Sequence, residues 1–212
     1  MKDLNKKLGW AILLVVLILF FVLYLMGRSS FTYEGKNGDY KFTVEKVESV
    51  IIYRPHVFYE NKEYVYAFRN KPQRLEGISM EEDILNHLER PGGLKEVFIT
   101  KAVNLSSLTN GSVSLVTAPM ASVLGKSEYG LYKTNIRVAF TEFHGAQPAP
   151  VVDCSTVNLN GNVNRTIAVI YLKLGDENRI YSDGDCIIIE GKNTEGLIKS
   201  GEKFAYALLG VF

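Results

Sequence analysis

The clearest hydrophobic pattern in the chain is an uninterrupted apolar run near the amino terminus, from Leu8 to Met26. These 19 residues contain no charged side chain, proline or asparagine. As a helix rising 1.5 Å per residue, the run would cover roughly 28 Å, close to the ~30 Å hydrocarbon core of a bilayer. Trp10 and Tyr24 lie near its two ends, where amphipathic rings favour the headgroup region. The pattern predicts a transmembrane helix over 8–26.

The charges that flank this run predict its orientation. Lys2, Lys6 and Lys7 precede it, and only Arg28 follows it closely. Because basic residues stay on the cytoplasmic side, we expect the amino terminus inside and the bulk of the chain outside. The sequence thus predicts a single-pass protein of the cell membrane, with the lipid bilayer contacted through 8–26.

A cleaved signal peptide is the alternative to an anchor. A secretory signal has an apolar region of roughly 7–15 residues followed by small residues at the cleavage site. The run is longer here, and Tyr24, Leu25 and Met26 make a poor cleavage site. We expect an uncleaved anchor. The chain then divides into a cytoplasmic tail (1–7), the anchor (8–26), a polar linker (27–39) and an exterior domain (40–212).

Beyond residue 39 the pattern changes to short β-type segments separated by turns. Apolar and polar residues alternate in 40–44, as they do in a half-buried strand. The isoleucine-rich segment 186–190 lacks this alternation and predicts a strand buried on both faces. The segments predicted as strands are 40–44, 47–53, 56–59, 63–68, 95–101, 112–117, 135–141, 166–174, 178–182 and 186–190.

Three segments have helical signals. Ser79 and Glu82 form a capping-box pattern, which predicts a helix from Ser79 that ends at Arg90 to Gly93. A short helix is predicted over 119–124, and a longer one follows a cap at Asn193 or Thr194 and ends at Gly210. Strands interleaved with helices predict an α/β fold, with a mixed α+β fold as the alternative, for a mixed-sheet exterior domain. The Gly- and Pro-containing segment 143–153 is a candidate subdomain boundary.

Composition and charge exclude several classes of protein. The chain has 212 residues, 47% of them hydrophobic and 22% charged, with a formal net charge of +1. Such a chain is neither an acidic disordered protein nor a basic nucleic-acid-binding tail. Beyond residue 28 there are 20 basic and 22 acidic side chains, so no field that would attract nucleic acid is expected.

Two cysteines and three glycosylation motifs acquire meaning from the predicted exterior location. Cys154 and Cys186 are the only cysteines, and outside the cell such a pair can persist as a disulfide; two free buried thiols are the alternative. The N-x-[ST] motifs begin at Asn104, Asn110 and Asn164 in polar, turn-like stretches. They are candidate glycosylation sites, with unmodified surface asparagines as the alternative.

Motifs for catalysis, metals and cofactors are weak or absent in the sequence. Gly191 to Thr194 joins a strand to a helix, as in phosphate cradles, but helix capping explains it without a ligand. His87, on the predicted first helix, has no second ligand at helical spacing and is expected to be structural, and His144 lies in the 143–153 loop. We predict no cofactor and no metal, and assign no catalytic residue.

The aromatic hairpin 56–68 contains Phe58, Tyr59, Tyr64, Tyr66 and Phe68. These rings could stack on a sugar or a peptide, but cross-strand packing is the expected role of most aromatic residues on paired strands.

Two features from Leu94 onward carry a family resemblance. One is the motif G-x-C-I-I-x-x-G at Gly184 to Gly191, and the other is the terminal helix ending in Leu208-Leu209-Gly210-Val211. Together with the first cysteine they resemble a group of membrane-anchored archaeal proteins. The resemblance covers about half of the chain and implies a two-cysteine α/β exterior module in an archaeal envelope.

The function expected from these features is non-enzymatic. An anchored, near-neutral exterior domain without catalytic motifs favours a structural role or docking of an envelope protein partner. The alternatives are an anchored hydrolase that acts on an extracytoplasmic polymer and a glycan-binding module that uses the aromatic hairpin. No nucleic-acid partner is expected, and the sequence predicts no oligomeric state.

Overall fold

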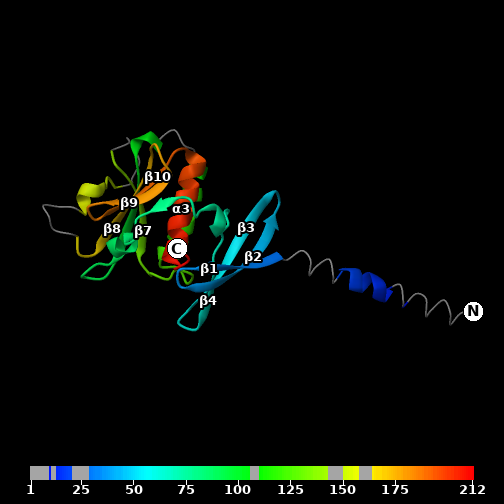
Figure 1. Cartoon of the computed structure of the whole chain (residues 1–212). Helices are drawn as coiled ribbons and strands as arrows, with labels where there is room; N and C mark the ends of the chain where they lie inside the picture. Colours follow the sequence, from blue (N-terminus) through cyan, green and yellow to red (C-terminus); the bar gives the residue numbers. More distant parts are fainter. Residues whose placement is uncertain (1–9, 11–12, 21–28, 106–109, 143–149, 158–163) are drawn as a thin grey trace, which may run out of the picture.

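The computed structural model describes Trp10 and residues 13–20, 29–105, 110–142, 150–157 and 164–212. They form two β-sheets and two long helices, which confirms the mixed α/β architecture (Figure 1). Residues 13–20 are helical and exposed. Within the described ranges we find no helix with both the length and the apolar character needed to cross a bilayer.

The first sheet is a four-stranded antiparallel meander in the order β1-β2-β3-β4. Its first strand forms from residues that the sequence predicted as a polar linker, because Ser29 to Gly35 pair with Val44 to Gly38. Phe31 on this strand stacks on Phe42 with ring centroids 4.8 Å apart, so the supposed linker belongs to the folded body. The strands are β1 (Ser29–Gly35), β2 (Gly38–Val47), β3 (Val50–Tyr59) and β4 (Lys62–Val65).

The second sheet is mixed and has the strand order β5-β9-β10-β8-β6-β7. Strands β10, β8, β6 and β7 run parallel to their neighbours, while β9 pairs antiparallel to β10. Strands on either side of the candidate boundary 143–153 lie in this one sheet. The strands are β5 (Ser79–Met80), β6 (Glu96–Lys101), β7 (Asn135–Phe140), β8 (Ile167–Leu174), β9 (Arg179–Asp183) and β10 (Cys186–Gly191).

Helix α3 (Thr194–Leu208) packs against both sheets. Its Leu197 and Ala205 belong to the core shared with β8 and β10, and the Tyr206 ring stacks 3.8 Å from Phe68 beside the first sheet. The sequence predicted one apolar stripe, but almost the whole circumference of α3 is buried. Asn193 caps the helix by accepting a hydrogen bond from the Gly196 N–H, as predicted.

Helix α2 (Asn110–Leu124) corrects one prediction and extends another. The segment 112–117 was expected to be a strand and 119–124 a separate helix, but the two form one helix with Pro119 inside it. Burial of Val116 and Met120 against the core stabilises the helical form over the extended one that Ser, Val and Thr favour locally. Gly201 permits the close contact with α3, since a Cβ there would lie 2.8 Å from Val116 Cγ1.

The helix predicted to begin at Ser79 is also wrong. Ser79 and Met80 form β5, which pairs with Arg179 and Ile180 of β9. A short 3-10 helix, η2 (Ile84–Leu88), follows where the α-helix was expected. Pairing with a neighbouring strand satisfies the backbone of Ser79 and Met80, so the local capping signal has no helix to cap. The other 3-10 helices are η1 (Pro72–Arg74), η3 (Val103–Leu105) and η4 (Cys154–Thr156).

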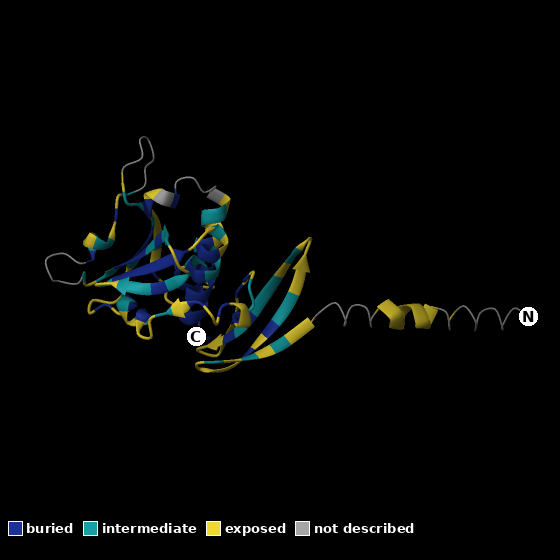
Figure 2. Cartoon of the chain, turned by 45° about the horizontal axis from the view of Figure 1, so that its top comes forward, coloured by how far each residue is buried: buried dark blue, intermediate teal, exposed yellow. Residues whose placement is uncertain are grey.

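The disulfide predicted between Cys154 and Cys186 is present, with the two Cα atoms 5.2 Å apart. It ties η4 to the first residue of β10, on the face of the second sheet that points away from the helices. A small second core surrounds it and includes Phe98, Val157 and Val169. The buried residues fill the space between and beneath the sheets, whereas the end of the β2–β3 hairpin is exposed (Figure 2).

Candidate functional site

One candidate site is a groove of about 800 Å³ at the carboxyl ends of the parallel strands, on the disulfide face of the second sheet. We call it the carboxyl-edge groove. Strands β6 and β8 are neighbours, but the chain leaves them toward opposite edges of the sheet. From β6 it continues through α2 to β7, and from β8 it continues to β9. Open α/β sheets bind ligands at such a topological switch point. The polar side chains lining the groove include Thr141, Glu142, Asp153, Tyr171, Lys173 and Tyr181.

The buried carboxylate of Glu190, the fifth residue of β10, contacts Lys173 and Tyr181 of the groove lining. Lys173 Nζ lies 3.0 Å and Arg179 Nη2 3.3 Å from Glu190 Oε2, and the Tyr181 hydroxyl donates to the same oxygen. Gly175 makes room for the carboxylate, because a Cβ at that position would lie 2.3 Å from it. Glu190 also accepts a hydrogen bond from the Glu177 N–H, and this bond attaches the β8–β9 turn to β10.

The charges of this network are set by their neighbours. Burial alone would raise the pKa of Glu190, but hydrogen bonds from Lys173, Arg179 and the Glu177 N–H outweigh burial and hold the pKa at about 2. The pKa of Lys173 is raised by its hydrogen bond with Tyr181 and by its ion pair with Glu190. Burial raises the pKa of Tyr171, and the positive charge of Lys173 partly offsets this increase. At neutral pH the groove therefore presents a neutral Tyr171 near the Lys173–Glu190 ion pair.

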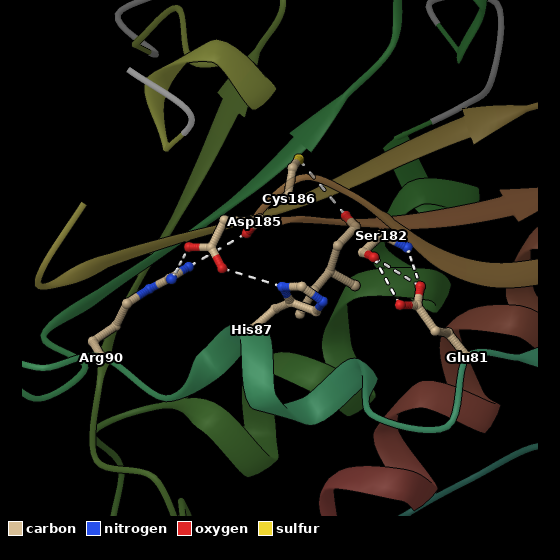
Figure 3. Close-up of polar contacts among 7 residues, drawn as sticks. Glu81, His87, Arg90, Ser182, Asp185 and Cys186 are labelled. Atoms are coloured by element: carbon tan, nitrogen blue, oxygen red, sulfur yellow. Dashed lines mark hydrogen bonds and ion pairs between the residues drawn. The ribbon is translucent and has the colours of Figure 1, made fainter. Parts of the chain in front are cut away.

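A second polar cluster joins η2 to the β9–β10 turn (Figure 3). One carboxylate oxygen of Asp185 accepts a hydrogen bond from Arg90 Nη1. The other oxygen lies 3.1 Å from His87 Nδ1. The Arg90 side chain is 1% exposed, so its guanidinium is almost completely shielded from solvent in this ion pair. His87 thus has a structural partner, in keeping with the expectation for this residue.

The Ser182 hydroxyl belongs to a different contact in the same region. It donates to Glu81 at 2.9 Å, and the Ser182 N–H donates to the other Glu81 oxygen at 2.7 Å. These bonds lower the pKa of Glu81. Figure 3 shows the Ser182 hydroxyl turned toward Glu81 while His87 faces Asp185. The serine, histidine and aspartate are therefore neighbours engaged in two separate contacts, rather than a hydrogen-bonded relay for nucleophilic catalysis.

The second candidate surface is an apolar groove of about 850 Å³ between the β2–β3 hairpin, the segment 65–69 and α2. We call it the hairpin–helix groove. Helix α2 contributes Leu115, Ala118, Pro119 and Ser122, which recur at the spacing of one helical stripe. A different stripe of α2, including Val116 and Met120, faces the core. In this second stripe Pro119 is buried, whereas Leu115 and Ala118 are exposed in the groove.

Two further features give this groove a polar element. Pro119 has no N–H to donate to the Leu115 carbonyl, a hydrogen bond that a regular helix would make. Glu202 lies at the base of the groove and accepts hydrogen bonds from the Arg69 and Asn70 N–H groups at 2.6 and 3.0 Å. Burial raises the pKa of Glu202 despite these bonds.

The remaining sequence-predicted residues have varied outcomes. Asn164 is half-buried, and its Oδ1 accepts hydrogen bonds from the Thr166 and Ile167 N–H groups at 3.1 Å. The side chains of Asn104 and Asn110, and all of His144, lie outside the described residues. Among the described residues, no group of three or more His, Cys, Asp or Glu side chains is placed to hold a metal ion.

The aromatic hairpin divides into two sets of rings. Tyr64, Tyr66 and Phe68 are buried, as expected for cross-strand packing, whereas Phe58 and Tyr59 are exposed near the β3–β4 turn. A glycan-binding face that uses all five rings is therefore wrong. Sequence reasoning also missed Glu190 and Glu202, although a glutamate that ends an isoleucine run, or one inside an apolar helix, is the kind of signal that marks a buried charge.

Compared with known protein families, with curated proteins and with solved structures, the chain matches none.

Proposed function

We propose that this protein is a single-pass, membrane-anchored docking protein whose folded domain lies outside the cytoplasm. The 19-residue uncharged run at 8–26 and its three preceding lysines support the anchor and its orientation. The Cys154–Cys186 disulfide supports an oxidising compartment, because cytosolic thiols are kept reduced.

The observation that carries the docking role is the second apolar stripe of α2. Leu115 is 36% exposed and, with Ala118, faces the hairpin–helix groove rather than the core. The exposed apolar side chains of Leu115 and Ala118 are available for packing with another molecule, and the groove has the volume typical of binding clefts.

The occupant that fits is an apolar segment of another envelope protein, from the part of that protein just outside the bilayer. Val47 and Val50 line the groove, and they lie at the end of the first sheet where β1 begins. Since Ser29 follows the proposed anchor by only two residues, this end of the domain faces the membrane. A neighbouring anchored protein can reach the groove with the segment that leaves its own membrane span.

The test is site-specific photocross-linking in intact cells, with the reactive side chain at Leu115. We expect a discrete adduct with one protein, and we expect Ala118→Arg, which fills the groove with a charged side chain, to abolish it. The matched control is Val138→Arg, because Val138 is a 49% exposed apolar residue on β7 outside the groove. An adduct that survives Ala118→Arg, or that is lost equally in both variants, contradicts the proposal.

The anchor has its own test. We expect the full chain to remain in the membrane pellet after an alkaline wash, and protease added to intact cells to remove the folded domain. Cells whose domain resists the protease, or full chain that is recovered with the cytosol, would overturn the proposed location.

A second candidate function is binding or hydrolysis of a hydroxylated polymer in the carboxyl-edge groove. The observation favouring it is that Glu142, Asp153 and Asp183 come from three separate segments and line one groove together with Tyr171 and Tyr181. Carboxylates and aromatic rings are the side chains that recognise and cleave glycans. Titration with soluble envelope oligosaccharides tests it. Binding that is weakened by Glu142→Gln supports this function, and no heat of binding excludes it.

A further inference from the structure

The β2–β3 turn presents apolar side chains to solvent at one end of the two central strands of the first sheet. Val47 is 45% and Ile51 is 47% exposed, although both are β-branched aliphatic residues on paired strands. In the described structure neither side chain belongs to the hydrophobic core. Val47 pairs with Val50 and Ile51 pairs with Lys46, so the two side chains lie on opposite faces of the hairpin and each face of the tip carries an exposed aliphatic residue.

The register of the strands places this tip relative to the start of β1. Ser29, the first residue of β1, pairs with Val44, so the residues 45–47 of β2 continue past it in the direction from which the chain enters the sheet. At 3.3–3.4 Å per residue, three residues carry the tip roughly 10 Å beyond Ser29. The β2–β3 turn therefore extends further toward the origin of the chain than any part of β1.

The sequence sets how far Ser29 can lie from the proposed anchor. Gly27 and Arg28 alone separate Met26 from Ser29. Three Cα–Cα steps span at most roughly 11 Å, and the headgroup layer on each side of a bilayer is roughly 5–8 Å thick. With Ser29 held this close to the hydrocarbon boundary, a tip that extends about 10 Å further reaches the headgroup layer and the ends of the acyl chains.

The charges at the tip indicate what kind of surface it meets. Glu45 is paired with Arg54 at 2.7 Å, and the exposed Lys46 and Glu48 balance each other. The tip thus offers aliphatic contact without net charge, which suits the apolar boundary of a bilayer and gives no preference for anionic lipid.

We infer that the β2–β3 hairpin is a second membrane contact, whose tip inserts into the outer leaflet and holds the domain at a defined orientation to the bilayer. The inference rests on the anchor in the proposed function; of the two exposed aliphatic residues at the tip, Val47 also lines the hairpin–helix groove and Ile51 does not.

The test uses the full chain reconstituted in phosphatidylcholine vesicles, with a fluorophore on a cysteine introduced by Ser49→Cys in the turn. The native cysteines are bonded to each other, so only the introduced thiol is labelled. Lipids that carry a quencher on the acyl chain report the depth of the label. The matched control is Lys36→Cys, because Lys36 lies in the β1–β2 turn at the opposite end of the same strands.

We expect about a twofold loss of fluorescence at position 49 and little loss at position 36, since an inserted tip brings its label to the acyl boundary. Ile51→Asp should relieve the quenching at position 49, and replacing part of the lipid by an anionic one should leave it unchanged. Vesicle flotation separates the two proposals. A chain that floats but shows equal quenching at both positions overturns the hairpin contact alone, whereas a chain that does not float removes the anchor and the hairpin contact together.

Discussion

Lys173 and Glu190 lie opposite each other on the parallel strands β8 and β10, and their charged groups are 3.0 Å apart. The glutamate is almost completely buried while the lysine reaches solvent at the carboxyl-edge groove. The pair therefore connects the interior of the second sheet to the surface of a candidate ligand site. Loss of this ion pair is therefore expected to lower the free energy of unfolding of the domain.

Glu190→Gln should destabilise the domain by about 1–3 kcal/mol, because Lys173 and Arg179 lose their buried partner but are 29% and 41% exposed and remain partly hydrated. Chemical denaturation of the full chain in detergent micelles measures the loss. Glu177→Gln is the control, since Glu177 is exposed in the same β8–β9 turn and should change stability by less than about 0.5 kcal/mol. Equal stability of the two variants would show that the Glu190 network contributes nothing.

The low pKa of Glu190 predicts a pH dependence with a definite sign. The folded-state pKa is about 2 and the ordinary value is 4.5, so the folded state binds the proton more weakly than the unfolded state. The stabilisation is fully present above about pH 4.5 and is lost as the pH falls toward 2. Wild type and Glu190→Gln should therefore converge in stability over that window. A difference that stays constant from pH 6 to pH 2 would contradict the assignment.

Removing the disulfide should cost about 3–4 kcal/mol, because the bond closes a loop with a sequence separation of 32 and restricts the unfolded chain. The Cys154→Ser/Cys186→Ser variant, compared with wild type by thermal unfolding, measures this loss. Adding reductant to the variant should have no effect, while the wild type should approach it. Free thiols that react in the untreated native protein would refute the bond.

Asp185→Asn should destabilise the domain by about 3–5 kcal/mol, since it leaves the Arg90 guanidinium buried without a counter-charge. The attachment of η2 to the β9–β10 turn should loosen first, which hydrogen exchange of the backbone around His87 would detect. Asp176→Asn, in an exposed turn, is the control. Unchanged exchange in the Asp185 variant would argue that the cluster does not hold η2.

Gly201→Ala should destabilise the domain by about 1–2 kcal/mol, although alanine favours helices by about 1 kcal/mol over glycine. The reason is that a Cβ at position 201 meets Val116 of α2 at 2.8 Å, so the two helices must separate. Gly77→Ala is the matched control, because a Cβ there meets nothing within 4 Å. A more stable Gly201 variant would mean that the helix contact yields easily.

The sequence by itself predicted the elements whose signal is local and redundant. The strand Cys186–Gly191 is apolar from Cys186 to Ile189, and Asn193 and Gly210 mark the two ends of α3. The same holds for the disulfide, because a chain with two cysteines leaves each of them one candidate partner. Such patterns need no knowledge of distant residues, since burial and capping are encoded where they occur.

Tertiary structure decided the features that depend on which distant segments meet. Ser79 pairs with Arg179 of β9 instead of starting a helix, and Val116 becomes helical because it packs on α3. The partners of Glu190 and the two candidate grooves likewise arise from strands and helices far apart in the sequence. Local propensities amount to about 1 kcal/mol per residue or less, and burial of a whole side chain or pairing of a strand exceeds them.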